Sequence, residues 1–239
     1  MGVGIKATKK TNFKKTNNKK NIFDSIPAEL IIDIVARVAA SSSRDLFKAK
    51  LSCETLHKFA DDKYIIQRAS LDKFPVVPWT LNDHKQAIFS DRCADSENPE
   101  ALCRRGIVRY FEKMEMNSGI ECLLKAAKSG HLEAMYVLGL IMILHGEETK
   151  EQGMKIIIDM KNLQTKRKNI QKIRESFSTT LGSIWVKNTM VVGQAMPTCC
   201  TRQDHAKSIG LNKLADLECA ACSCDQEIVH LWEILPKSI

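Results

Sequence analysis

Two paired helices are indicated by residues 119–139, which read GIECLLKAAKSGHLEAMYVLG. Glycines in and around this stretch recur at a nearly fixed distance. Gly106 and Gly139 are 33 residues apart, and Gly119 and Gly153 are 34 apart. Periods of this length are typical of helix-turn-helix solenoids, in which small residues let paired helices approach closely. The spacing therefore predicts an all-α repeat region.

This repeat region, residues 98–188, is too short to be stable alone. Residues 159–162 read DMKN where the preceding unit has KAAK, so roughly one and a half repeats are recognisable. A stack normally needs about three units. Apolar residues from Ile170 to Trp185 keep helical spacing. We expect a helix there to cover the repeats.

A second helical pattern lies near the N-terminus. Ser25 is an N-cap candidate, and Pro27 and Glu29 after it favour a helix start. An apolar stripe with helical spacing follows, formed by Leu30, Ile31, Ile34, Val35 and Val38. Serines at 41–43 interrupt it, and a further helical stretch runs from Asp45 to Asp62. We predict three short helices over residues 23–62.

The composition is that of a globular protein. Of the 239 residues, 44% are hydrophobic and 27% are charged, which excludes wholesale disorder and collagen-like repeats. Aromatic residues make up only 6%, so an all-β sandwich is disfavoured. No apolar stretch reaches the roughly 18 to 20 residues that span a bilayer. We expect no membrane association.

The net charge of +8 comes mainly from the first 20 residues, which contain seven lysines and no acid. Without them the remaining net charge is +1. Such a lysine-rich leader has little to bury and is expected to be disordered. It could be a nuclear-import or polyanion-binding segment, or simply a solvated leader. Lysine at position 6 excludes the myristoylation motif.

Nine cysteines without a secretory signal indicate a reducing compartment, so we expect a nuclear or cytoplasmic protein. Five of these cysteines lie in the last 41 residues: Cys199, Cys200, Cys219, Cys222 and Cys224. The pair Cys219 and Cys222 has the spacing with which two thiolates bind one zinc ion. The other three cysteines or a histidine could complete the site. The alternative is that reduced cysteines pack as small apolar residues.

Residues 26–56 resemble an F-box, whose pattern is Leu-Pro-x-Glu-Leu, a spaced Ile-Leu pair and a later Val-Cys-Lys segment. Ile26-Pro27-Ala28-Glu29-Leu30 carries the first part, and Leu51-Ser52-Cys53 the last. The departures are Ile26 for Leu, Ser52 for Val and Glu54 for a basic residue. With residues 70–79, SLDKFPVVPW, the segment is similar to a plant F-box family.

The resemblance implies docking on a Skp-type adaptor, which joins an F-box protein to a cullin and a RING subunit in an SCF ubiquitin ligase. The residues expected to contact the adaptor are Ile26, Pro27, Glu29, Leu30, Ile34, Val38, Leu46, Leu51, Cys53 and Leu56. A unit of about 40 residues cannot bury every apolar side chain of its stripe, and a helix of a partner protein could bury those that stay exposed. Alternatively, the stripe packs entirely on downstream helices of the same chain.

Residues 125–139 are similar to a Sel-like repeat, a relative of the tetratricopeptide repeat. A concave helical surface binds peptides or proteins, so the repeat region is the candidate for recruiting a protein substrate; it could also be a spacer. The basic stretch 166–174 could recruit an acidic target or form a solvated helix face. The tail is similar to a MYND-type zinc finger, although only one Cys-x-x-Cys pair is intact.

An enzyme is disfavoured because the sequence lacks a nucleophile elbow, a phosphate-binding loop, a dinucleotide fingerprint and a His-Glu-x-x-His helix. We therefore predict a non-catalytic ligase subunit. The alternative is a nucleic-acid-binding or scaffold protein with a zinc-stapled C-terminus. Nucleic acid is disfavoured because the charge outside the leader is only +1.

The expected fold is all-α, with an N-terminal three-helix F-box, a short Sel-like solenoid and an irregular cysteine-rich tail. The expected segments are the leader 1–22, the F-box 23–62, connecting helices and a linker 63–97, the repeat region 98–188 and the tail 189–239.

Overall fold

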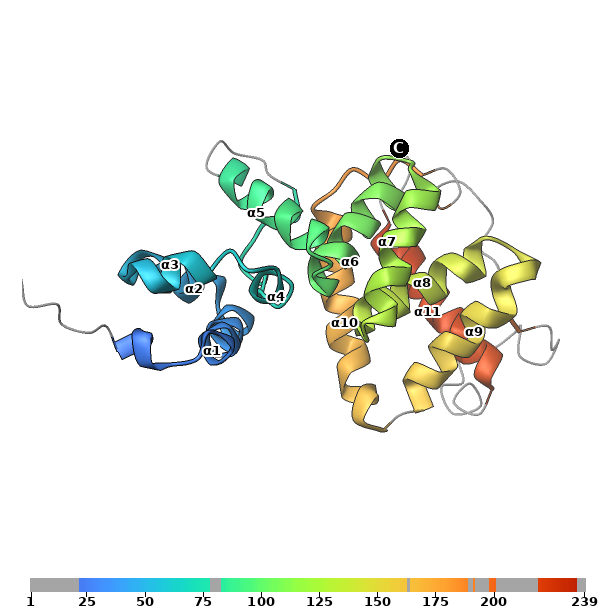
Figure 1. Cartoon of the computed structure of the whole chain (residues 1–239). Coiled ribbons are helices and arrows are strands. Elements are labelled where there is room, and N and C mark those ends of the chain that lie inside the picture. Colours follow the sequence, from blue (N-terminus) through green and yellow to red (C-terminus); the bar gives the residue numbers. More distant parts are fainter. Residues whose placement is uncertain are drawn as a thin grey trace, which may run out of the picture.

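The computed structural model of this protein describes residues 22–77, 83–162, 164–188, 191, 198–200 and 219–235. These residues form helices and connections without strands, which confirms the all-α prediction (Figure 1). None of the described helices combines the length and apolar character that crossing a membrane requires. The predicted leader lies outside the described residues except for Ile22.

The N-terminal unit contains the three predicted helices, α1 (Ala28–Ser41), α2 (Ser43–Ser52) and α3 (Glu54–Phe59), preceded by a 3-10 turn (Ile22–Ser25) and followed by α4 (Lys63–Ile66). Pro27, and not Ser25, occupies the N-cap of α1. The predicted serine interruption is a single residue, Ser42, whose hydroxyl accepts the Asp45 N–H at 3.2 Å and so starts α2. Cys53 separates α2 from α3 in the same way, because its sulfur accepts the Leu56 N–H at 3.4 Å.

A connecting helix, α5 (Asp83–Asp95), leads to the repeats. It lies in the segment 63–97, for which connecting helices and a linker were predicted, and the polar residues after Ser90 continue the helix as far as Asp95. Glu97 adopts a positive φ of 63° and reverses the chain. Asn98 then caps the next helix by accepting the Ala101 N–H at 3.1 Å.

Two helical hairpins form the predicted repeats, α6 (Pro99–Ile107) with α7 (Met116–Lys128), and α8 (Leu132–Leu144) with α9 (Glu147–Asn162). A π-helical turn, Val108–Glu112, follows α6. The glycines recognised in the sequence are the points of closest approach. A Cβ on Gly119 would lie 2.9 Å from the Gly106 carbonyl oxygen, and one on Gly153 would lie 2.6 Å from that of Gly139. Any larger residue would push the paired helices apart.

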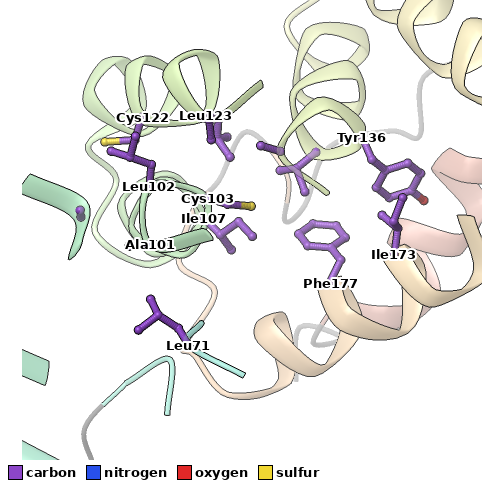
Figure 2. Close-up of a cluster of buried hydrophobic side chains, with 14 of the residues drawn as sticks. Leu71, Ala101, Leu102, Cys103, Ile107, Cys122, Leu123, Tyr136, Ile173 and Phe177 are labelled. Carbon is purple, nitrogen blue, oxygen red and sulfur yellow. The ribbon is translucent and has the colours of Figure 1, made fainter. Parts of the chain in front are cut away.

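Helix α8 is the centre of the repeat region, with nine of its 13 residues buried. It is covered on one side by α10 (Gln164–Gly182), which starts earlier than the helix expected from Ile170 and ends before Trp185. Figure 2 shows Phe177 of α10 beside Tyr136 of α8, with ring centroids 6.2 Å apart. Trp185 lies beyond the helix and is exposed, so it does not cover the repeats as predicted.

The described part of the C-terminal tail is mostly helical, although we expected it to be irregular. Residues 220–234 form α11 (Ala220–Ile234), which packs on α9 and α10. Its Glu227 is fully buried and contacts three other helices. Helix α11 is therefore part of the core of the repeat region.

The N-terminal unit and the repeats share a hydrogen-bonded junction. Asn98 is buried, and its side-chain amide donates to the carbonyl oxygens of Ile66 at 3.1 Å and Ala69 at 2.8 Å. The Glu100 carboxylate accepts the Leu71 N–H at 2.9 Å. Because side chains at the start of α6 satisfy the backbone after α4, the position of the N-terminal unit relative to the repeats is fixed.

Candidate functional site

Helix α1 has one buried and one exposed apolar face. Ile31 and Val35 are buried against the rest of the chain. Leu30 and Ile34 lie one turn apart and keep 55% and 56% of their surface exposed. We call these two residues the docking ridge. Glu29 beside it is also exposed, as is Pro27 at the start of the helix.

The other residues predicted to contact an adaptor divide into two groups. Leu51 is 85% exposed on α2, and Ile26, Val38, Cys53 and Leu56 are half-buried, so all have surface available to a partner. Leu46 is only 1% exposed. Its side chain belongs to the core of the N-terminal unit, and we remove it from the set.

Two further apolar side chains of the N-terminal unit are exposed but were not among the predicted contacts, Phe47 on α2 and Tyr64 on α4. Phe47 stands four residues before Leu51, so both lie on one face of α2. That spacing was readable in the sequence. Which of the neighbouring residues Leu46 and Phe47 points inward was decided by packing.

Three of the five cysteines predicted to bind metal come together. The sulfur atoms of Cys200, Cys219 and Cys222 all lie within 4.8 Å of one another, and Cys200 and Cys219 are 3.9 Å apart. We call these three residues the cysteine cluster. Sulfurs about 3.8 Å apart are what a tetrahedral zinc site with Zn–S bonds of ~2.3 Å requires. The cluster could hold a metal ion.

Local contacts explain how the cluster is built. The carboxylate of Asp225 on α11 accepts the backbone N–H groups of Cys199 at 2.6 Å and Cys200 at 3.0 Å, which holds this segment against the helix. Burial, together with the neighbouring Cys200 and Cys219 thiols, raises the pKa of the Cys222 thiol to about 12. A bound cation would reverse this effect by stabilising thiolates.

The remaining two predicted ligands do not join the cluster. The Cys224 sulfur lies 3.8 Å from the Met154 carbonyl oxygen, and burial raises its pKa to about 11. Cys199 is also buried, and burial raises the pKa of its thiol. Both behave as the small apolar residues of our alternative interpretation. Two histidines, His205 and His230, lie near these cysteines in the sequence. His205 is outside the described residues, and His230 on α11 does not join the cluster.

A buried ion-pair network joins the tail to the repeats. The Glu227 carboxylate accepts the Tyr136 hydroxyl at 2.9 Å, the Arg174 Nε–H at 2.8 Å and the Lys161 ammonium at 2.5 Å. Burial alone would raise the pKa of Glu227, but the two cations outweigh it and the pKa lies below its usual value. Arg174 of the basic stretch therefore has a structural partner within the chain.

Comparison with known proteins gives consistent results. The family described as plant tetratrico peptide repeats matches residues 71–182. A putative F-box protein of Arabidopsis thaliana is 33% identical over 201 residues, which are 80% of this chain and 65% of that protein. A second F-box protein of the same plant is 26% identical over 123 residues, covering 52% of this chain and 74% of that protein. No solved structure matches the chain.

A third Arabidopsis thaliana F-box protein is 29% identical over 125 residues, but this match covers only 32% of that protein. The chain thus spans about two thirds or less of two of these relatives. The printed names of these relatives agree with the F-box resemblance found in the sequence, and the residues that match the repeat family include the two glycine-paired hairpins. The chain is therefore similar to plant F-box proteins, and its residues 71–182 match a plant family of tetratricopeptide-type repeats.

Proposed function

We propose that this chain is a non-catalytic substrate receptor of an SCF-type ubiquitin ligase, working in the nucleus or cytoplasm. It docks on a Skp-type adaptor, and through it on a cullin, by means of the docking ridge. The main support is that Leu30 and Ile34 stay more than half exposed although the same helix buries Ile31 and Val35. Adjacent exposed apolar side chains on a short helix suit a partner helix.

A receptor of this kind contributes proximity. It holds a protein substrate near the ubiquitin-charged enzyme and so raises the effective concentration of the reacting groups. We assign substrate recruitment to the repeat region, residues 98–188. Because α10 and α11 cover the central α8, the recruiting surface belongs to the outer helices and to the edges they share with the N-terminal unit.

The test is a binding measurement with a purified Skp-type adaptor. Leu30→Ala combined with Ile34→Ala should weaken binding by at least the roughly 2 kcal/mol typical of interface hot spots, about 30-fold. Because both side chains are largely exposed, the melting temperature should change little. Leu124→Ala, which removes an exposed leucine from α7, is the matched control and should bind normally. Unchanged adaptor binding by the folded double variant would contradict the proposal.

We further propose that the cysteine cluster binds one zinc ion that fastens α11 to the segment around Cys200. Its support is the 3.9 Å separation of two sulfurs and the presence of a third within 4.8 Å. The reduced protein should purify with about one zinc ion per chain, and Cys219→Ser with Cys222→Ser should lose it and melt lower. Cys53→Ser is the control, because serine also caps a helix and Cys53 lies in the N-terminal unit. Metal-free wild-type protein would refute this assignment.

The competing function is a nucleic-acid-binding or scaffold protein that uses a zinc-stapled C-terminus. Copurification separates the two, because a ligase receptor brings adaptor and cullin with it and a scaffold does not. Nucleic-acid binding that depends only on the lysine-rich leader would fall steeply with salt and would be non-specific.

A further inference from the structure

A groove of about 780 Å³ lies between α2 and α5, away from the repeat hairpins. Its base is a cluster of three phenylalanines. The rings of Phe47 and Phe89 meet edge to face with centroids 5.0 Å apart, and Phe74 lies 5.4 Å from Phe89. Leu51 of α2 and Ile88 of α5 line the groove and are exposed. An apolar side chain of a bound partner could therefore contact both α2 and α5 in the groove.

The rim of the groove is strongly basic. Among the residues that the structure describes, one acid, Asp72, and five cationic residues line it; the cations are Arg44, Lys48, Lys73, Lys85 and Arg92. Lys48 pairs with Asp45 and Arg92 with Asp61. The other three, Arg44, Lys73 and Lys85, are exposed and make no ion pair within the part of the chain that the structure describes.

These charges restrict what can occupy the groove. The chain's own leader carries seven lysines and no acid, so the rim repels it. A second copy would bring the same basic face and a net charge of +8. An acidic segment is attracted to the rim, and its apolar side chain can reach the phenylalanines between the cations. Lysine and arginine side chains also have apolar stems that help to cover such a side chain.

We propose that this groove binds an acidic stretch, rich in Asp and Glu and carrying a Phe or Leu side chain, on the protein that the receptor recruits. The inference rests on the proposed function. It adds a second substrate contact outside the repeat region 98–188, and it names the chemical class of the substrate segment that binds there. The carboxylates meet Arg44, Lys73 and Lys85, and the apolar side chain packs between Phe47 and Ile88. Affinity therefore comes from apolar burial, while charge supplies speed of association and specificity.

The experiment measures fluorescence anisotropy of a labelled peptide with the full chain. The probe is a short peptide of Asp and Glu with one Phe and one Leu, compared with the same peptide after Gln and Asn replace the acids. The acidic peptide should bind the wild-type chain at least about tenfold more tightly. Raising the ionic strength should weaken that preference, because the rim charges are exposed.

Lys73→Glu with Lys85→Glu should weaken the acidic peptide at least tenfold, and Ile88→Ala should weaken it by a smaller factor. The matched control is Lys128→Glu with Lys155→Glu, which changes the net charge equally at exposed positions of α7 and α9 and should bind as the wild type does. Equal losses in both double variants would reveal non-specific attraction and overturn the proposal. So would an absence of peptide binding by the wild-type chain.

A separate measurement keeps this proposal apart from the proposed function. Adaptor affinity should be unaffected by the Lys73 and Lys85 substitutions and reduced by those at Leu30 and Ile34. Loss of adaptor binding in the rim variant, with peptide binding unchanged, would assign the groove to the adaptor and overturn the substrate proposal. A different outcome would refute only the ligase function. In that outcome the wild-type chain binds the peptide, the rim variant does not, and no form of the chain binds the adaptor.

Discussion

Replacing Gly153 with alanine tests whether α8 and α9 are held together by the contact that the repeat spacing predicts. The added methyl group would lie 2.6 Å from the Gly139 carbonyl oxygen and 3.0 Å from Ile143. Both the oxygen and the Ile143 backbone nitrogen are fixed parts of α8, so the clash cannot be relieved by turning a side chain. The two helices must separate.

The size of the effect follows from two opposing contributions. Alanine favours a helix over glycine by about 1 kcal/mol. Inserting a methyl group into a closely packed contact typically costs about 1–3 kcal/mol, and more where the backbone must move. With the backbone on the receiving side, we expect a net loss of about 2 kcal/mol. At roughly 2–4 °C per kcal/mol for a chain of this size, the melting temperature should fall by about 4–8 °C.

The control is the same substitution at Gly182, the last residue of α10. A Cβ there meets no atom within 4 Å, so only the helix preference remains. Gly182→Ala should be neutral or more stable by a few tenths of a kcal/mol. Gly139→Ala is the intermediate case, since its methyl group would press mainly on the Ile157 side chain at 3.0 Å, which can adjust.

Urea denaturation followed by circular dichroism measures all three variants. The expected order of stability is Gly182→Ala, then Gly139→Ala, then Gly153→Ala. A Gly153→Ala protein as stable as the Gly182→Ala protein would show that α8 and α9 do not approach as described, and the repeat packing would have to be revised.

Two further substitutions probe the buried polar contacts. The pKa of Glu227 lies below its usual value, because the cations Arg174 and Lys161 outweigh the effect of burial, which alone would raise it. A carboxylate of this kind stabilises the fold above its unfolded-state pKa, and the contribution is lost as pH falls through the lower folded-state value. Glu227→Gln should therefore lower the free energy of unfolding by about 3–5 kcal/mol near neutral pH, and the difference from wild type should shrink in acid. Urea denaturation at several pH values measures this difference. A difference that does not change with pH would contradict the role of the charge. Asn98→Ala should cost about 2–4 kcal/mol, because it removes the buried side-chain donor to the carbonyl oxygens of Ile66 and Ala69 and removes the cap of α6. Hydrogen exchange should then speed up around residues 66–71, and unaltered exchange there would argue against a fixed junction.

Much of the fold followed from local patterns. The glycine spacing predicted closely paired helices in a repeat region, and the α1 stripe predicted a helix with excess apolar surface, because 3.6-residue periodicity and close helix packing are encoded by nearby residues. Helix ends were less predictable. Ser25 and Pro27 both suit a helix start, and the choice of Pro27 as the cap depends on the turn that precedes it.

The candidate sites were predictable in kind, but their members were not. The F-box pattern named ten contact residues, yet only packing could place Leu46 in the core and leave its neighbour Phe47 at the surface. Cysteine spacing indicated a metal site. The choice of Cys200 over Cys199 as the third sulfur depends on how Asp225 holds both backbone amides.

The sequence by itself determined the helical class, the period of the repeats and the apolar stripe of α1, since each depends on residues within a few helical turns. The tertiary structure decided where α11 packs and which residues surround Glu227. This glutamate meets Arg174 and Tyr136, which are 53 and 91 residues away in the chain, and no local pattern records such partners. A buried charge is tolerated only where distant elements bring its counterions, so its role appears only once the chain has folded.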